Sequence, residues 1–183
     1  MAAVAFEAFP SIPRLSRSCV ISEKIDGTNA QVYVGEDGVV LAGSRNRWIT
    51  PEADNYGFAA WVKAHEEDLR TGLGPGRHFG EWWGSGIQRR YGLSEKRFSL
   101  FNAGRWSSER PACCHVVPVL YAGIFTSTVV DEVLAKLGRD GSVAAPGFMN
   151  PEGVVVYVSA AKQLFKKTLH GDEHKGAADG STP

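Results

Sequence analysis

Residues 22–29 read Ser22-Glu23-Lys24-Ile25-Asp26-Gly27-Thr28-Asn29 and place a lysine in a polar turn between two apolar segments. Residues 19–21 form an apolar run, and residues 30–34 alternate in the manner of a β-strand. A free lysine has a pKa of about 10.4, so it attacks phosphorus at neutral pH only where nearby cations or a dry pocket lower that pKa. Gly27 permits close approach of a phosphate or ribose, and Asp26, Thr28 and Asn29 offer hydrogen-bonding groups. The turn is equipped for a nucleotide, although these eight residues alone fit a solvated lysine equally well.

Length and composition predict one ordinary globular domain, because 183 residues with 43% hydrophobic content can bury a large core. The 20 basic and 20 acidic residues cancel, so a nucleic acid would have to be held by a local basic patch. The three cysteines offer neither an even disulfide framework nor zinc spacing, which favours a reducing cytoplasm. No run approaches the roughly 20 apolar residues of a membrane span, so we expect a soluble protein without a membrane partner.

Hydrophobic periodicity predicts a mixture of strands and helices. A hairpin is expected over 30–34 and 39–42, one amphipathic helix over 55–70, and strands ending at Glu81 and covering 98–102 and 116–121. Capping-box spacing at 128–131 predicts a helix that Gly138 stops, and a further strand follows Glu152. The two prolines in 10–13 indicate an extended arm. The small polar residues from 171 to 183 indicate a disordered tail.

Several stretches carry residues that could bind or react with a substrate, and each also has an ordinary interpretation. Arg45 and Arg47 stand beside Trp48, and Arg89 and Arg90 precede Tyr91. These arginines fit phosphate contacts or a solvated surface equally. Glu81, Phe101 and Glu152 lie in or beside short apolar strands, where a phenylalanine is usually core. The last stretch is 164–169, with Lys166 and Lys167.

Taken together, these stretches resemble one family. Lys-Xaa-Asp-Gly between two strands resembles motif I of the covalent nucleotidyltransferases. The longer stretch 23–29 and the Gly-Ser-Gly-Ile-Gln at 84–88 resemble ATP-dependent RNA ligases of the T4 RNA ligase 2 type. Glu81 resembles motif III, Phe101 motif IIIa, Glu152 motif IV and Lys166 motif V of that family. Asp26 departs from the histidine of that ligase. Thr168 departs from its second motif V lysine, which leaves open whether Lys167 or Lys162 substitutes.

The resemblance implies an α+β nucleotidyltransferase domain over residues 1–170, with antiparallel sheets flanking a nucleotide cleft and a few outer helices. It implies that Lys24 is adenylated by ATP, that Mg²⁺ or Mn²⁺ acts with Glu152, and that the AMP then passes to a 5′-phosphate. A 3′-hydroxyl displaces the AMP and seals the RNA, either between free ends or at a nick in a duplex. The implied nucleotide contacts are Glu23, Asp26, Gly27, Asn29, Arg45, Glu81, Phe101, Glu152 and Lys166. The implied nucleic-acid contacts are Arg45, Arg47, Arg89, Arg90 and Lys167.

Two other functions compete with this prediction. A capping-type guanylyltransferase would use GTP on the same lysine, and a non-catalytic nucleic-acid-binding module derived from a ligase would not react at all. The family enzyme also carries a C-terminal domain, which we do not expect after Leu169. That difference predicts either a preference for preadenylated ends or a partner protein that supplies the domain.

Overall fold

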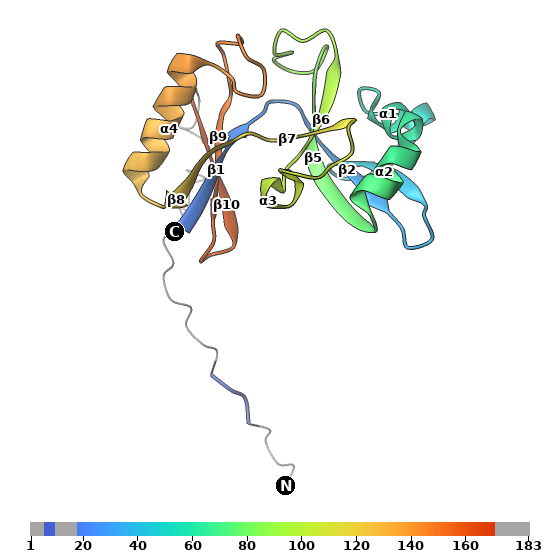
Figure 1. Ribbon diagram of the computed structural model, residues 1–183, viewed down its shortest axis with the longest axis horizontal. Helices are drawn as coiled ribbons and strands as arrows, with labels where there is room; N and C mark the ends of the chain where they lie inside the picture. Colours follow the sequence, from blue (N-terminus) through green and yellow to red (C-terminus); the bar gives the residue numbers. More distant parts are fainter. Residues whose placement is uncertain (1–5, 10–17, 171–183) are drawn as a thin grey trace, which may run out of the picture.

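Two β-sheets of four and six strands stand side by side in the computed structural model, which describes residues 6–9 and 18–170 (Figure 1). The strand orders are β10-β9-β1-β8 and β4-β3-β2-β5-β6-β7, and all neighbours are antiparallel except β6 and β7. The predicted α+β class with antiparallel sheets is confirmed. The predicted arm and tail fall on residues 10–17 and 171–183, outside the described part of the chain.

The chain crosses between the sheets at residues 25–27. It leaves the four-stranded sheet at the end of β1 (Ser18–Lys24) and enters the six-stranded sheet with β2 (Thr28–Val34). The other strands are β3 (Val40–Ser44), β4 (Trp48–Ile49), β5 (Gly76–Gly84), β6 (Lys96–Leu100), β7 (Cys114–Val116), β8 (Val119–Ile124), β9 (Gly153–Val158) and β10 (Gln163–Thr168). The helices are η1 (Pro51–Ala53), α1 (Phe58–Ala64), α2 (Glu66–Leu73), α3 (Ala103–Trp106) and α4 (Ser127–Asp140).

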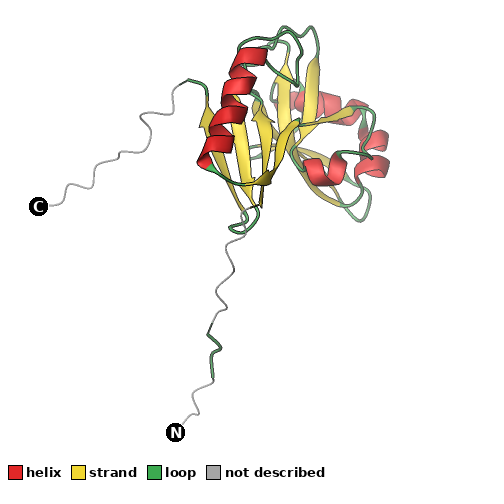
Figure 2. Ribbon diagram, turned by 60° about the vertical axis from the view of Figure 1, so that its left-hand side comes forward, coloured by secondary structure: helices red, strands yellow, loops and turns green. Residues whose placement is uncertain are grey.

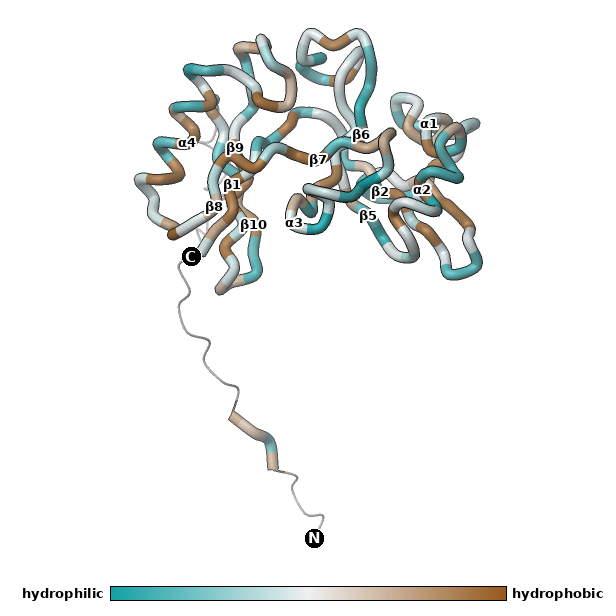
Figure 3. The backbone as a smooth tube through the Cα atoms, in the orientation of Figure 1, coloured by the Kyte–Doolittle hydropathy of each residue, from teal (hydrophilic) through white to brown (hydrophobic). Residues whose placement is uncertain are grey.

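Each sheet has one face covered by helices and one face left open toward the space between the sheets (Figures 1 and 2). Cys19 and Ile21 of β1 pack with Leu134 of α4, whereas the alternate residues of β1 lie on the open face. Hydrophobic and hydrophilic residues alternate along α4, as expected for a helix that covers a sheet with one side (Figure 3). Trp82 and Phe98 of the six-stranded sheet are buried under α1 and α2.

The predicted helix over 55–70 is wrong in one respect, because two helices occupy that stretch. His65 has φ −112° and ψ 19°, which ends α1 and begins α2. Its backbone N–H is shared between the carbonyls of Trp61 and Val62, and its ring Nδ1 lies 2.8 Å from the Trp61 oxygen. The hydrophobic spacing that predicted one helix continues across the break, so it gave no sign of the break.

The predicted strand over 116–121 divides between the sheets. β7 ends at Val116 in the six-stranded sheet, and β8 begins at Val119 in the four-stranded sheet. Pro118 lies between them and cannot donate to a strand ladder, and its carbonyl accepts from the Glu23 backbone N–H at 2.9 Å. This segment is therefore a second crossing.

The bounds of α4 also differ from the prediction. Thr126 caps the helix, its hydroxyl accepting from the Val129 N–H at 3.0 Å, and the helix ends at Gly141 with φ 86°. Gly138 lies inside the helix, where a Cβ would come within 2.9 Å of Leu169. Close packing, rather than helix termination, explains that glycine. No helix in the described residues is long and apolar enough to cross a membrane.

Candidate active site

Lys24 and Glu152 form an ion pair where the chain leaves the four-stranded sheet. Lys24 is the last residue of β1, and its Cα is paired with that of Gly153, the first residue of β9. Glu152 directly precedes that strand, and its Oε2 lies 2.7 Å from the Lys24 Nζ. Both side chains are partly buried, so the pair is shielded from water more than an ordinary surface pair. The register of two neighbouring strands thus brings together residues that are far apart in the sequence.

Glu81 faces the same crossing from the six-stranded sheet. Its Oε1 accepts from the Gly27 N–H at 3.1 Å and its Oε2 from the Asn29 side-chain amide at 3.3 Å. Burial raises the pKa of Glu81 to about 7, although Lys24 and the Gly27 amide lower it. Glu152 and Asp26 raise the pKa further, because they add negative charge nearby. A buried carboxyl poised near neutral pH, beside a lysine, is typical of a functional site.

Gly27 is required by the protein's own packing. A Cβ at this position would come within 2.5 Å of the Trp82 carbonyl oxygen and 2.7 Å of the Trp83 Cβ. The close approach that we expected for a phosphate is therefore made by strand β5. The Gly27 N–H faces the Glu81 carboxylate, to which it donates a hydrogen bond.

A polar row crosses the open face of the six-stranded sheet at the level of Glu81. Asn29 and Ser99 are its cross-strand partners on β2 and β6, and His115 of β7 is paired with Ser99. Continuing the β2–β3 register by one residue places Arg45 beside Asn29. Phe101, the residue predicted to stack on adenine, lies two residues beyond Ser99 on the same face and is 43% exposed. The structure thus brings Asn29, Glu81 and Phe101 to one face, with the exposed Arg45 at its end.

The motif V lysines separate onto opposite faces of β10. Lys166 is paired with Val155, which is paired with Ser22, so Lys166 shares the open face with Lys24. Thr168 lies on that face too, level with Gly153 and Lys24, two strands or about 10 Å away. Lys167 points to the helix-covered face, where it forms an ion pair with Asp131 of α4.

Neither candidate for the second motif V lysine lies near Lys24. Lys167 is on the wrong face of the sheet, and Lys162 lies in the turn before β10, at the far end of the sheet. The place of the second lysine is held by Thr168, whose hydroxyl donates to the His170 carbonyl at 3.1 Å. Nucleic-acid contact by Lys167 stays a prediction without support from its position.

Glu23 lies on the opposite face of β1 from Lys24. Its buried carboxylate accepts from the Ser142 hydroxyl at 2.5 Å and from the backbone N–H groups of Val143 and Ala144 at 2.9 Å. Burial raises the pKa of Glu23, and these three hydrogen bonds oppose the rise. Glu23 therefore anchors the loop after α4, and its contact with a nucleotide stays a prediction.

Arg89 joins the lysine turn to the segment before β9. Its Nε donates to Asp26 Oδ2 at 2.9 Å, and its Nη1 donates to the carbonyl and side-chain oxygens of Asn150 at 3.1 Å and to the Pro151 carbonyl at 3.3 Å. The Tyr91 hydroxyl accepts from the Asp26 N–H at 2.8 Å. We expected Arg89 to contact nucleic acid, yet these bonds occupy it within the protein.

The remaining predicted contacts with nucleic acid lie outside the cluster. Arg47 is exposed and donates to the Ala53 carbonyl at 3.4 Å, and Arg90 is exposed with φ 61°. The interpretation of the sequence missed Tyr91, Asn150 and Ser142, which position Asp26, Arg89 and Glu23. No local pattern marks these three, because their partners are at least 61 residues away.

The carboxylates of the site fit a metal ion that arrives with a nucleotide. The described residues contain no group of three or more His, Cys, Asp or Glu side chains arranged to hold an ion. Mg²⁺ is commonly held by one or two carboxylates together with substrate phosphates and water. Glu152, with Glu81 nearby, supplies this donor set.

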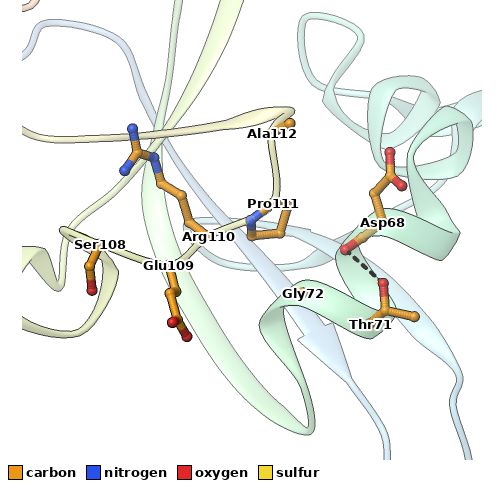
Figure 4. Close-up of a pocket in the computed structure, with 8 residues that line it drawn as sticks. All are labelled: Asp68, Thr71, Gly72, Ser108, Glu109, Arg110, Pro111 and Ala112. Carbon is orange, nitrogen blue, oxygen red and sulfur yellow. Dashed lines mark hydrogen bonds between the residues drawn. The ribbon is translucent and has the colours of Figure 1, made fainter.

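A cavity of about 630 Å³ lies away from the crossing, between α2 and residues 108–112 (Figure 4). Its lining includes Asp68, Thr71, Glu109 and Arg110 but none of the residues described above. Gly72 is packed against this loop, since a Cβ there would come within 2.6 Å of Pro111. No lysine lines this cavity, whereas the crossing pairs Lys24 with Glu152, so the crossing is the better candidate.

Two sheets with a lysine at their junction have the architecture of a nucleotidyltransferase domain. The RNA ligase family model matches residues 17–168, and the chain belongs to the RNA ligase family. No curated protein matches the sequence significantly.

Solved structures of a Naegleria gruberi RNA ligase share the fold. The ligase with PPi is 21% identical with a TM-score of 0.62, and the match covers 83% of this chain and 49% of that one. One mutant with ATP and Mn is 20% identical with a TM-score of 0.63, covering 84% and 50%. Another with AMP and Mn is 18% identical with a TM-score of 0.61, also covering 84% and 50%. This chain spans about half the length of these ligases.

Proposed function

We propose that the protein is an ATP-dependent RNA ligase that works through a lysyl-AMP intermediate on Lys24, within a nucleotidyltransferase domain comprising residues 1–170. The observation that carries the proposal is the Lys24–Glu152 pair at the crossing, facing Glu81 and flanked by Lys166 on the same sheet face. The related ligase structures with ATP, AMP and PPi are consistent with this proposal, since ATP is consumed and pyrophosphate released when the lysine is adenylated, and AMP is released when the strand is sealed.

In the first step the Lys24 amine attacks the α-phosphorus of ATP. A phosphorus–nitrogen bond forms, the bond to the bridging oxygen breaks, and pyrophosphate leaves. Lys24 must first lose a proton and separate from Glu152, because an ammonium held by a carboxylate has no lone pair to donate. Lys166 and Arg45 bring positive charge to the phosphates, and Glu81 accepts from the ribose hydroxyls while Phe101 stacks on adenine. Mg²⁺ or Mn²⁺, when bound with Glu152, neutralises the negative charge that grows on the phosphates.

The later steps transfer AMP to RNA and then release it. An RNA 5′-phosphate takes the AMP from Lys24, and the 3′-hydroxyl of another end then displaces AMP to form the phosphodiester. We place Arg45 at the 5′-phosphate because a guanidinium matches phosphate oxygens. RNA repair in the cytoplasm, at a nick or between free ends, is the setting that we propose.

Intact mass after incubation with ATP and Mg²⁺ tests the proposal. We expect the mass of one AMP to be added to the wild-type protein and to Lys162→Ala, the control lysine in the turn before β10. Lys24→Ala should acquire none. Incubation with GTP in parallel separates the ligase from a guanylyltransferase, and a GMP adduct without an AMP adduct would overturn our proposal.

A second candidate is a non-catalytic RNA-binding module, and Thr168 favours it. The family's second motif V lysine is absent from the face that carries Lys24 and Lys166. Such a module would bind RNA equally well with Lys24 or Ala at position 24 and would show no adduct with either nucleotide.

A further inference from the structure

A row of exposed aromatic side chains lies next to the proposed nucleotide site on the open face of the six-stranded sheet. The row follows the strand register, in which Trp48 is paired with Gly43, Gly43 with Gln31, and Gln31 with Phe79. Phe101 continues it, since its N–H donates to the Phe79 carbonyl at 3.0 Å. We call Trp48, Gln31, Phe79 and Phe101 the aromatic row. It spans four strand spacings, or about 19 Å, and lies two residues, or about 7 Å, from the row that contains Glu81.

The aromatic rings of this row are open to solvent. Phe79 is 54% exposed and Trp48 is 44% exposed, although aromatic side chains usually bury most of their area. Arg77 lies two residues before Phe79 on β5. Its guanidinium carbon is 5.3 Å from the centroid of the Tyr33 ring and 5.2 Å from that of the Trp48 ring. It also donates to Gln31 Oε1 at 3.1 Å. Arg77 thus holds the end of the row in place without covering Phe79.

Positive charge and a small cavity accompany the row. A cavity of about 150 Å³ is lined by Arg77, Phe79, Phe101 and Arg105, together with His78, Asn102 and Trp106, and no acidic residue lines it. The chain as a whole has zero net charge, whereas this cavity is lined by two arginines and no acid, so the surface here is locally positive. Glu36 and Asp37 lie beyond the row, in the turn between β2 and β3. A polyanion with flat apolar groups matches this combination.

The open face of the four-stranded sheet provides a comparison within the same protein, because its exposed apolar side chains are of a different kind. The exposed apolar side chains there are the aliphatic Val20, Ile124 and Leu164 and a single ring, that of Tyr157. Aliphatic side chains can dock another protein surface but do not stack on a base, whereas rings beside arginines suit bases and phosphates. The difference between the two faces favours RNA over protein on the aromatic row.

We propose that the aromatic row is a stacking platform for unpaired RNA bases next to the strand end that is joined. Phe101 would hold the adenine of AMP, while Phe79 and Trp48 would hold bases of the RNA and Arg77 and Arg105 its phosphates. The inference deepens the proposed function and rests on it, because it names single-stranded rather than fully paired RNA as the substrate class beside the site.

Tryptophan fluorescence provides a specific test. Of the five tryptophans, Trp48 is the exposed one, since Trp82, Trp83 and Trp106 are buried and Trp61 is partly buried. We expect a 12-nucleotide oligouridylate, added without ATP or metal, to quench the emission of the wild-type protein. Trp48→Phe should lose the quenching while keeping its affinity in fluorescence anisotropy, because phenylalanine still stacks. A blunt RNA duplex of the same length should bind more weakly and quench little.

Affinity measurements on variants complete the test. Trp48→Ala and Phe79→Ala should each weaken oligouridylate binding about tenfold, as loss of one stacked base predicts. Tyr157→Ala, which removes an exposed ring from the other sheet, should bind as the wild type does. Each variant's thermal midpoint shows whether it folds, and Trp48→Phe remains informative if Trp48→Ala does not.

Other outcomes overturn the proposal. Equal binding by all variants, or equal quenching by duplex and single strand, would show that the row does not stack on bases. If Phe79→Ala abolished self-association of the protein and left RNA binding unchanged, the row would be an interface with a second copy. Because no ATP is present, these results are independent of the AMP adduct. A missing adduct would therefore reject the ligase proposal without affecting the platform.

Discussion

The open face of the four-stranded sheet carries Lys24 and Lys166 among mostly aliphatic side chains with one exposed ring, Tyr157, whereas the open face of the six-stranded sheet carries Glu81 among aromatic and amide side chains. One face offers cations for phosphates, and the other offers an acceptor for hydroxyls and rings for bases. With these proposed roles, each sheet would contact a different part of the nucleotide. The difference indicates that the site depends on how the two sheets are held together.

Two features hold the sheets in position at the crossing. Ile25, between β1 and β2, is buried with Trp83 and Val117, so the two crossings share a small core. Arg89 spans from Asp26 to Asn150 and Pro151, linking the lysine turn to the segment that carries Glu152. Their effect is to fix Lys24 and Glu152 relative to Glu81.

The largest effect that we expect within the comparison comes from the lysines of β10. Lys166→Ala should slow formation of the AMP adduct by about 10² to 10³-fold, because it removes a charged donor from the face that we propose holds the phosphates. Single-turnover adenylation with radiolabelled ATP measures the rate. Lys167→Ala is the matched control, since it removes the neighbouring charge from the helix-covered face and should change the rate less than about twofold.

An equal loss in both variants would break the comparison. It would mean that general positive charge, rather than the face of the sheet, supports adenylation. A loss confined to Lys167→Ala would show that the register assigned to β10 is not the one used in the reaction.

A smaller effect, on the pH dependence of the free energy of unfolding, is expected from Glu81, the buried acid of the six-stranded sheet. The pKa of Glu81 is about 7 in the folded protein against an ordinary value of 4.5, so the folded protein keeps a proton that the unfolded chain has lost between these pH values. This group's contribution to the free energy of unfolding is therefore complete below pH 4.5 and falls as pH rises to 7, by up to about 3 kcal/mol. Urea unfolding across this pH range measures the decline, and Glu81→Gln should reduce it.

Glu95 supplies the control for that measurement. Its carboxylate is largely exposed and pairs with Arg97, so Glu95→Gln should leave the pH dependence of unfolding close to that of the wild type. A pH profile of Glu81→Gln identical to that of the wild type would contradict the raised pKa.

Much of the fold was predictable because its strands are short, alternating and bounded by turn residues. Alternation from residue 30 and the turn at 35–38 suffice to predict the β2–β3 hairpin. The break at His65 was not predictable, since the apolar spacing runs through it. The predicted strand over 116–121 divides at Pro118, and the only sign of this in the sequence is that proline has no N–H to donate. No local pattern predicts which sheet each half joins.

The site was predictable as a set of residues but not as an arrangement. Family resemblance picked out Lys24, Glu81 and Glu152, which the structure brings to one crossing. The tasks of Glu23 and Arg89 were missed because both depend on partners in the loop and segment between α4 and β9. Whether Lys166 or Lys167 faces Lys24 depends on strand register, and a shift by one residue exchanges the two faces.

The smallest effect, and the one that sharpens the comparison most, is expected at Thr168. Its Cα is level with Gly153 and Lys24 on the open face, so Thr168→Lys adds a cation to the sheet that already supplies the cations. The side chain is partly exposed and the new charge would be screened, so we expect a gain of about 1 kcal/mol, or about fivefold, in the rate of adenylation. Gln163→Lys, on the other face of β10 by the same alternation and at its far end, is the control and should give no gain. A faster reaction in Thr168→Lys alone would show that the four-stranded sheet is short of one cation. An unchanged rate would show that Lys166 suffices, or that the missing charge comes from the six-stranded sheet through Arg45.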